Sequence, residues 1–362
     1  TKENNSIIKL KLAKKEIEIY PRPTSYKVTL NTLQFENPIS YIELTANKNF
    51  VDGIVLGPLA PATENLSHKD LLKLQNEQIL HKMKPIVADP GLIRFWPQSK
   101  WRHTDFELFS WEYFPSILIF DFADYKIQDD FLKRLAFFVE KSGYVGTLMT
   151  DEEIANQHGY NAHDYKAESL ASFFDTAQKQ NFQLNQSELL LRHILLENGI
   201  IKSEGNKILP GNGAIISLSK QSANYLRNSF LCHEGMHGVF FIDEDYRIYI
   251  NELFNSTDKN SVEFLKAYFT ATPTLNYDIN DDYLLKNEFM GYLVQQGVSF
   301  TSNYFANNLA TRKGVNEKFP ELCRYIKKTK AQGFVESAMH LDEYLYNRWG
   351  MQTGREWTVY IN

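Results

Sequence analysis

The stretch "FLCHEGMHGVFFID", residues 230–243, places two histidines four positions apart, with a glutamate directly after the first. On an α-helix, residues four positions apart lie on one face, about one turn from each other. The flanks of the stretch are strongly apolar, so we expect a buried helix at about residues 221–241. Two imidazoles and a carboxylate on a buried helix are costly without partners, and a bound metal ion is their common partner.

The residues His233-Glu234-Gly235-Met236-His237 fit the pattern H-E-x-x-H. His233 and His237 can hold one Zn²⁺ ion at about 2.0–2.1 Å each. Glu234 can reach a water molecule on that ion and take its proton as general base, because the metal lowers the pKa of the water to about 7. With 9 histidines in 362 residues, a chance match has odds on the order of half a per cent. The pattern therefore predicts a zinc site.

A catalytic zinc ion needs a third protein ligand and an open fourth position. Glu288 is the first candidate, because it lies among apolar residues in a second predicted helix at about residues 281–296. Asp243 is the runner-up, since it follows His237 by six residues, where zinc peptidases with a longer motif place their third ligand. That motif needs a glycine turn three residues after the second histidine, and this chain has Phe240 there.

Two segments together, "HEGMH" and "NEFMGY" at residues 287–292, resemble the zincin metallopeptidases, specifically the gluzincin branch. In that branch one helix carries H-E-x-x-H, and a later helix supplies a glutamate ligand, often within N-E-x-x-(small)-(aromatic). The second pattern is matched by Asn287, Glu288, Gly291 and Tyr292. The resemblance implies a zinc cofactor with ligands His233, His237 and Glu288, and Glu234 as the general base.

The resemblance also implies a place for the substrate. The predicted strand "AIISLS" at residues 214–219 comes before the motif helix. It looks like the edge strand on which such enzymes align an extended peptide by β-addition. The residues that would do so are Ala214, Ile215, Ile216 and Ser217.

An oxyanion formed during peptide hydrolysis needs a hydrogen-bond donor. Tyr292 and His340 are the candidate catalytic residues for this role, and His340 is also a possible metal ligand. Spacing along the chain does not choose among the available donors, which are Tyr292, Tyr246, Tyr304, Arg312 and His340.

The segment "HGYNAHDY", residues 158–165, is a further polar cluster. We interpret it as a turn and helix start with Asn161 or Asp164 near the cap. The alternative is that it lines the substrate cleft.

Two cysteines, Cys232 and Cys323, exclude a disulfide-stapled scaffold. Cys232 is adjacent to His233, and adjacent helical positions point about 100° apart. We therefore expect Cys232 to be a buried thiol and not a metal ligand.

The whole pattern predicts an α+β protein. Short alternating or β-branched segments fill residues 1–60, and one helix is expected at residues 68–83. From about residue 106 the chain is mostly helical in pattern. We predict a mainly β N-terminal domain at residues 1–105, followed by a helix-rich, zincin-like metallopeptidase domain at residues 106–362.

Composition limits the partners of the chain. The net charge is −5, so no dominant basic face and no nucleic-acid partner are expected. The longest apolar runs are too short to span a membrane. The content of Asn, Lys and Tyr, the few cysteines and the absence of an initial Met suit an exported bacterial protein, periplasmic, surface-anchored or secreted, whose signal has been removed.

The sequence thus predicts a zinc metallopeptidase that hydrolyses peptide bonds with metal-activated water. Two alternatives stay open. One is a cell-surface or periplasmic binding protein that keeps a zincin scaffold without turnover, and the other is a zinc hydrolase of a non-peptide amide. The presence of Glu234 beside the three candidate ligands favours an enzyme, because a scaffold without catalysis usually loses its general base first.

Overall fold

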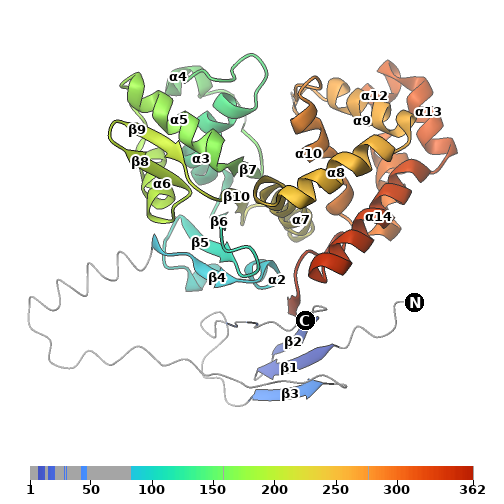
Figure 1. Cartoon of the computed structure of the whole chain (residues 1–362), viewed down its shortest axis with the longest axis horizontal. Helices are drawn as coiled ribbons and strands as arrows, with labels where there is room; N and C mark the ends of the chain where they lie inside the picture. The colour runs from blue at the N-terminus through green and yellow to red at the C-terminus, as the bar shows by residue number, and fades with distance from the viewer. Residues whose placement is uncertain are drawn as a thin grey trace, which may run out of the picture.

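The computed structural model describes residues 7–12, 15–20, 28, 30, 42–46, 83–157, 159–275 and 277–361. A β-rich N-terminal region precedes a helical C-terminal region, so the predicted α+β class is confirmed. Figure 1 shows helices α3–α6 on one side and helices α8–α14 on the other, with α7 between them. The helix predicted at residues 68–83, and most of the strands predicted beyond residue 20, lie outside the described residues.

The first sheet joins the two ends of the chain. Its strands are β1 (Ile8–Leu12), β2 (Lys15–Ile19), β3 (Ile42–Ala46) and β11 (Val359–Ile361), in the order β11-β2-β1-β3. All three strand pairs are antiparallel. Asp89 anchors the last strand, because its carboxylate accepts hydrogen bonds from the Thr358 backbone N–H and hydroxyl. The N-terminal sheet therefore depends on the C-terminal residues for its fourth strand.

The central sheet has five strands in the order β4-β5-β6-β10-β7. They are β4 (Ile86–Ala88), β5 (Phe106–Trp111), β6 (Ile117–Phe122), β10 (Ala214–Ser219) and β7 (His163–Lys166). β10 is parallel to β6 and antiparallel to β7. β4, from within residues 1–105, belongs to this sheet, and β11, from the C-terminal end, belongs to the first.

Both faces of the central sheet are covered. Every residue of β5, β6 and β10 is buried, which agrees with the mostly apolar sequences of these strands. Along β6, Leu118 and Phe120 pack into one core, and Ile117 and Ile119 pack into the other.

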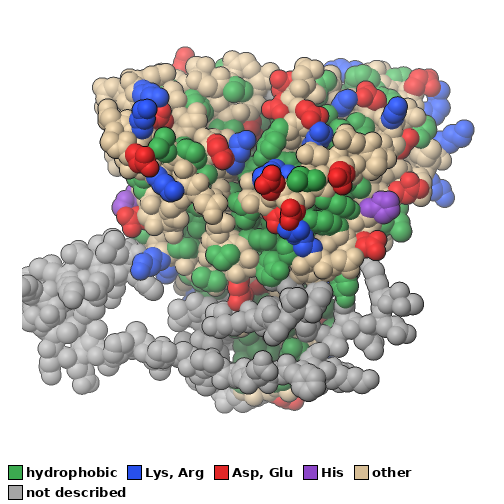
Figure 2. Space-filling view, viewed as in Figure 1, with side chains coloured by type: hydrophobic (Ala, Val, Ile, Leu, Met, Phe, Trp, Pro, Cys, Tyr) green, Lys and Arg blue, Asp and Glu red, His purple; other side chains and the backbone are tan. Residues whose placement is uncertain are grey.

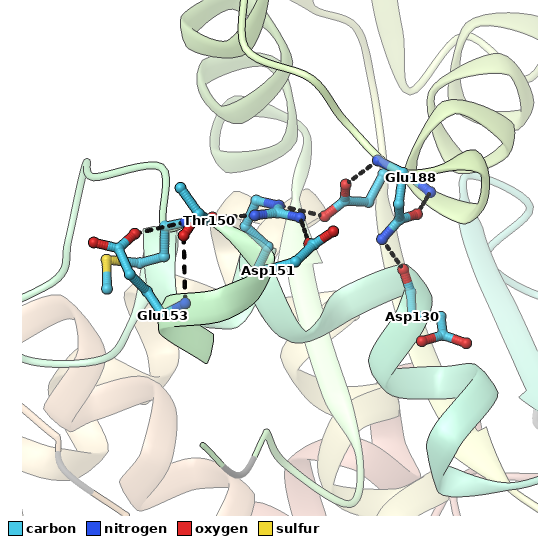
Figure 3. Close-up of polar contacts among 8 residues, drawn as sticks. Asp130, Thr150, Asp151, Glu153 and Glu188 are labelled. Carbon is cyan, nitrogen blue, oxygen red and sulfur yellow. Dashed lines mark hydrogen bonds and ion pairs between the residues drawn. The ribbon is translucent and has the colours of Figure 1, made fainter. Parts of the chain in front are cut away.

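The first core is covered by helices α3 (Tyr125–Val139), α5 (Ala167–Lys179) and α6 (Gln186–Glu197), beside the short helix α4 (Asp151–Ile154) and the hairpin β8 (Ile201–Glu204) and β9 (Lys207–Pro210). Figure 3 shows the polar link between α3 and α6. Arg134 Nε donates to Glu188 at 2.8 Å, and both side chains are buried. Arg134 also pairs with Asp151 at the start of α4.

The other face is covered by α7 (Asn224–Ile242), which contacts β10 and β7. The elements that follow are α8 (Glu244–Ser256), α9 (Lys259–Ala271), α10 (Asp282–Val294), α11 (Val298–Ser302), the π-helix η3 (Asn303–Leu309), α12 (Lys313–Lys318), α13 (Pro320–Lys328) and α14 (Gln332–Trp349). The two helices predicted from the sequence at about 221–241 and 281–296 are confirmed as α7 and α10.

The surface agrees with the charge and hydropathy of the sequence. On the face shown in Figure 2, acidic and basic side chains are interspersed. Within the described residues, no helix has the length and apolar character needed to cross a membrane. Cys232 and Cys323 are both buried free thiols, as expected for Cys232.

One buried carboxyl group lies behind α7. Glu356 is 1% exposed, and neither of its carboxyl oxygens has a hydrogen-bond partner among the residues the structure describes. Burial raises the pKa of Glu356 from 4.5 to about 8, and the thiol of Cys232 is a polar neighbour. The native state therefore holds this carboxyl neutral over a pH range in which the unfolded chain releases its proton.

We expect the native protein to lose stability as pH rises from about 4.5 to about 8, because the unfolded chain ionises Glu356 across that window and the native state does not. Glu356→Gln removes this contribution of Glu356 to the pH dependence of the free energy of unfolding. The free energy of unfolding of the variant should exceed that of the parent by up to about 2–5 kcal/mol at pH 8 and by little at pH 5. Melting temperatures at pH 5, 6.5 and 8 measure it, with the exposed Glu343→Gln as control. An equal gain at all three pH values would contradict the assignment.

Candidate metal centre

Helix α7 approaches the central sheet closely on one face and carries the histidines on another. A Cβ atom at Gly235 would lie 3.1 Å from the Trp111 ring, and one at Gly238 would lie 3.0 Å from Ile117 Cδ1. Glycine inside a helix costs about 1 kcal/mol relative to alanine. Here the close approach explains both glycines, and His233 and His237 face α10.

Helix α10 brings the third predicted ligand to the histidines. Asp281 caps this helix by accepting from the backbone N–H groups of Tyr283 and Leu284. Glu288 Oε2 lies 3.5 Å from His233 Nε2, and Glu288 Oε1 lies 3.8 Å from His237 Nε2. The structure therefore brings together the three residues that the sequence predicted as zinc ligands.

These three side chains fit a zinc ion. Their ligand atoms lie within 4.8 Å of one another, and tetrahedral zinc with bonds of about 2.0–2.1 Å separates its ligand atoms by about 3.3 Å. Both ring nitrogens of His237 and Glu288 Oε2 are buried without a hydrogen-bond partner among the described residues. Such unpartnered polar atoms are costly. Two imidazoles and one carboxylate form a donor set of catalytic zinc sites.

The ring of His237 is held in the neutral form, which is the form that can bind a metal. Burial, followed by the neighbouring His233, lowers the pKa of His237 to about 4, so its ring is neutral near pH 7. The side chain of His233 is 12% exposed. His233 Nδ1 lies 3.2 Å from Gln295 Oε1, and this contact leaves Nε2 directed toward Glu288.

The structure explains why the small position of the pattern N-E-x-x-(small)-(aromatic) is occupied here by Gly291. A Cβ atom there would lie 2.7 Å from His233 Cε1, 2.8 Å from His233 Nε2 and 2.9 Å from His237 Cε1. Any side chain at this position would displace both imidazoles. Position 291 is one turn beyond Glu288, so the glycine opens the space that the carboxylate faces.

Glu234 lies at the same site with a second carboxyl group, Asp164. The ligand atoms of Asp164, Glu234 and His237 form another group within 4.8 Å. Burial, followed by the neighbouring Asp164, raises the pKa of Glu234 well above its usual value. Burial also raises the pKa of Asp164 to about 6. Ligand atoms of the two carboxyls lie within 4.8 Å of each other, and two buried carboxyls at this separation do not both ionise readily when no metal is bound.

The prediction of a turn and helix start at residues 158–165 is wrong for its second half. His163 to Lys166 form strand β7, and helix α5 begins only at Ala167. His163 and Tyr165 are buried on one side of this strand, whereas Asp164 faces Glu234 on the other. The alternative that this segment lines the site agrees with the structure. The alternation of "HDYK" is a strand signal that the sequence already carried.

The predicted edge strand is also wrong. Ala214, Ile215, Ile216 and Ser217 belong to β10, which is paired on one side with β6 and on the other with β7. Their backbone groups are used within the sheet and cannot take a peptide. The edge beside α7 is β7, which pairs with β10 alone among the described strands.

Asp243 and His340 lie away from the cluster. Asp243 caps α8 by accepting from the Tyr246 N–H, and it pairs with Arg348 at 3.0 Å. The structure therefore gives Asp243 a structural task in place of the runner-up ligand role. His340 is exposed on α14, in a surface groove of about 460 Å³ between α14 and α8. It belongs to neither group of potential metal ligands, so its predicted role as a ligand or oxyanion donor is not supported.

The tyrosines that were candidate oxyanion donors lie at different distances from the histidines. Tyr292 packs edge-on against His233, with ring centroids 5.4 Å apart. Tyr304 and Tyr268 lie beside Tyr292, and Arg312 donates to the Tyr268 hydroxyl at 2.9 Å. Tyr246 is instead fully buried against Tyr344 and Trp349. Tyr292 and Tyr304 therefore stay candidates for the oxyanion donor, and Tyr246 does not.

Sequence reasoning missed two residues that border the site from the sheet side. Tyr160 donates its hydroxyl hydrogen to the Leu275 carbonyl at 2.9 Å, which links the loop before β7 to the loop before α10. Burial, then Glu140, Glu288 and Asp164, raise the pKa of Tyr160. Burial, then Asp164 and Glu288, also raise the pKa of Glu140. No local pattern marks Glu140, and Tyr160 was included only as part of the segment 158–165, which had been given a possible place in the substrate cleft.

No protein-family model, curated protein or solved structure matches this chain. Its function is therefore inferred from its own residues and their geometry.

We expect Glu288→Ala to abolish stoichiometric zinc binding, because the variant loses the only carboxylate that faces both imidazole Nε2 atoms among the described residues. Asp243→Ala is the matched control. It should cost about 1 kcal/mol of stability through loss of the α8 cap and keep its zinc. Metal analysis after dialysis measures both. Zinc lost from Asp243→Ala and retained by Glu288→Ala would reverse the assignment.

We expect Gly291→Ala to weaken zinc binding by at least about tenfold, since the added methyl group would push both imidazoles out of place. Alanine favours the helix by about 1 kcal/mol, so the metal-free fold should not suffer in proportion. Gly314→Ala on α12, where the added Cβ meets only ordinary contacts, is the control. Competition with a chelator measures the affinities, and equal values for the two variants would contradict the role of Gly291.

Proposed function

We propose that this chain is a zinc-dependent metallopeptidase of the gluzincin type. One observation carries the proposal: Glu288 on α10 faces both histidines of the H-E-x-x-H helix, and two of the facing atoms, His237 Nε2 and Glu288 Oε2, are buried without a hydrogen-bond partner among the described residues. The resemblance of "HEGMH" and "NEFMGY" to gluzincins supports the same conclusion from the sequence.

The proposed chemistry assigns each side chain a task. Zn²⁺, when bound, would supply an activated water molecule near pH 7. Glu234 accepts the proton of that water and later delivers it to the nitrogen of the leaving amine. Tyr292 and Tyr304 are the nearby neutral donors for the oxyanion.

The substrate would align along β7. Among the described strands it pairs only with β10, and it lies against α7, so an extended peptide would add to its other side by backbone hydrogen bonds. Asp164, in the middle of β7, would place its carboxyl between the peptide and Glu234. Glu234 is buried, with 7% of the residue exposed, so only a narrow approach to it is open for the scissile bond.

The two alternatives make different predictions. A binding protein on this scaffold would hold zinc without turnover, and a hydrolase of a non-peptide amide would leave peptides intact but cleave small amides. Export from a bacterial cell stays a prediction from composition.

We expect the parent chain to contain one zinc ion per molecule and to cleave members of a mixed peptide library. Glu234→Gln keeps the shape of the side chain and removes the base, so it should retain zinc and lose about 10²–10⁴-fold in rate. Mass spectrometry of the library and elemental analysis measure the two properties, with the exposed Glu252→Gln on α8 as control.

Three outcomes would count against the peptidase. Zinc in both proteins with no cleavage of peptides or small amides favours the binding protein. Cleavage of small amides alone favours the other hydrolase. Absence of zinc from the parent would leave "HEGMH" as a buried coincidence.

A further inference from the structure

Asp164 brings to the site a carboxyl group that the proposed hydrolysis does not itself need. One of its oxygens lies within 4.8 Å of the ligand atoms of both Glu234 and His237. Glu234 is the proposed base. His237 is fully buried, and neither of its ring nitrogens has a hydrogen-bond partner among the described residues. Asp164 therefore lies beside the place where the bond to be cleaved must lie.

Strand β7 turns Asp164 toward the helices of the site. Side chains alternate between the two faces of a strand, so Asp164 and Lys166 share one face. Lys166 Nζ lies 4.3 Å from the centre of the Tyr283 ring on α10, and Asp164 reaches Glu234 on α7. This face of β7 is therefore directed at the two helices that carry the proposed zinc ligands.

No protein cation balances Asp164. Among the described residues, no lysine or arginine forms an ion pair with Asp164 or Glu234, and Lys166 lies over Tyr283 instead. With Zn²⁺ bound, Glu288, Glu234 and Asp164 together would bring three negative charges to two positive ones. A partly buried carboxylate needs a cation or a hydrogen-bond donor as its partner. The substrate is the partner that remains.

The geometry of a peptide limits which substrate group can meet Asp164. The carbonyl group under attack must lie within reach of Glu234 and His237. In the residue that carries this carbonyl, the backbone nitrogen is two bonds from the carbonyl carbon, about 2.5 Å away. A lysine or arginine head group lies much farther away, at the end of a long flexible stem.

The backbone nitrogen is positively charged at pH 7 only when it is the N-terminus of the peptide, because an α-amino group has a pKa of about 7.7–8.0. An amide nitrogen inside a chain is neutral and would leave the charge of Asp164 unbalanced. The substrate group that fits this carboxylate in both distance and charge is therefore a free α-ammonium group.

We infer that Asp164 binds the α-ammonium group of the substrate, so that the chain acts as an aminopeptidase. Water is added across the first peptide bond, which releases one amino acid and leaves a peptide shortened by one residue. The inference rests on the proposed function and adds to it the substrate class, which is peptides with a free N-terminus. Asp164 belongs to neither the H-E-x-x-H pattern nor the N-E-x-x-G-Y pattern.

The first test measures binding without turnover. A peptide that the parent cleaves is synthesised with a free and with an acetylated N-terminus, and zinc-loaded Glu234→Gln is titrated with both by calorimetry. The free form should bind about 10–100-fold more tightly, because a hydrogen bond between two charged groups is lost on acetylation. Adding Asp164→Asn should reduce this preference to less than about threefold, since an amide carries no charge.

The second test is the position of cleavage by the catalytically active protein. Mass spectrometry of the products should show the loss of one N-terminal residue at a time, and the acetylated peptide should stay intact. Asp164→Asn should lose about 10–100-fold in kcat/KM on the free peptide. Asp164→Glu keeps the charge and should retain part of the preference for a free N-terminus.

Asp130→Asn is the matched control. Asp130 is an exposed carboxylate on the outer side of α3, where it pairs with Lys126 at 3.0 Å. Its loss should leave the preference for a free N-terminus as in the parent. Zinc content and melting temperature, measured on every variant, separate a change in specificity from a loss of metal or of fold.

The outcomes distinguish the inference from the function on which it rests. A parent that holds no zinc or cleaves no peptide overturns the proposed function, and the inference with it. A parent that cleaves interior bonds, and binds free and acetylated peptides equally, overturns the inference and leaves the peptidase intact. A preference for the free N-terminus that survives Asp164→Asn would show that another residue binds the α-ammonium group.

Discussion

Two buried helices, α7 and α10, meet through a carboxylate and two imidazoles. Glu288 faces His233 at 3.5 Å and His237 at 3.8 Å. Buried polar atoms without partners cost about 1–3 kcal/mol each, so this contact is unfavourable until a cation occupies it. Gly291 leaves the space for both imidazoles, and Gln295 Oε1 lies 3.2 Å from His233 Nδ1.

The central sheet supplies the other half of the site. Gly235 and Gly238 let α7 lie close to β5 and β6, and this approach places Glu234 beside Asp164 on β7. Strand β7, the proposed general base and the proposed metal ligands are then adjacent although they are far apart in the chain. Tyr160 closes the arrangement by bonding across to Leu275. The site therefore lies where the two halves of the molecule meet, as Figure 1 shows for α7 between β10 and α10.

Local patterns in the sequence predicted the parts of the site that lie within one helix. Residues 233 and 237 share a face because of helical geometry alone, and both helices were found at nearly their observed bounds. The edge strand was assigned to β10 because it precedes α7 in the chain. Which strand takes the edge depends instead on β7, a four-residue segment whose alternation was mistaken for a helix start. Asp243 and His340 were candidates by spacing, and packing places both elsewhere.

The sequence by itself determined the α+β class, the two helices and the identity of the candidate ligands, because periodicity and residue chemistry act over a few turns. Tertiary structure decided that Glu288 meets the histidines and Asp243 does not, that β7 is the free edge, and that Asp164, Gln295, Tyr304 and Tyr160 border the site. These contacts join residues separated by many positions in the chain. Their formation depends on how apolar faces pack against each other, and no local spacing records that.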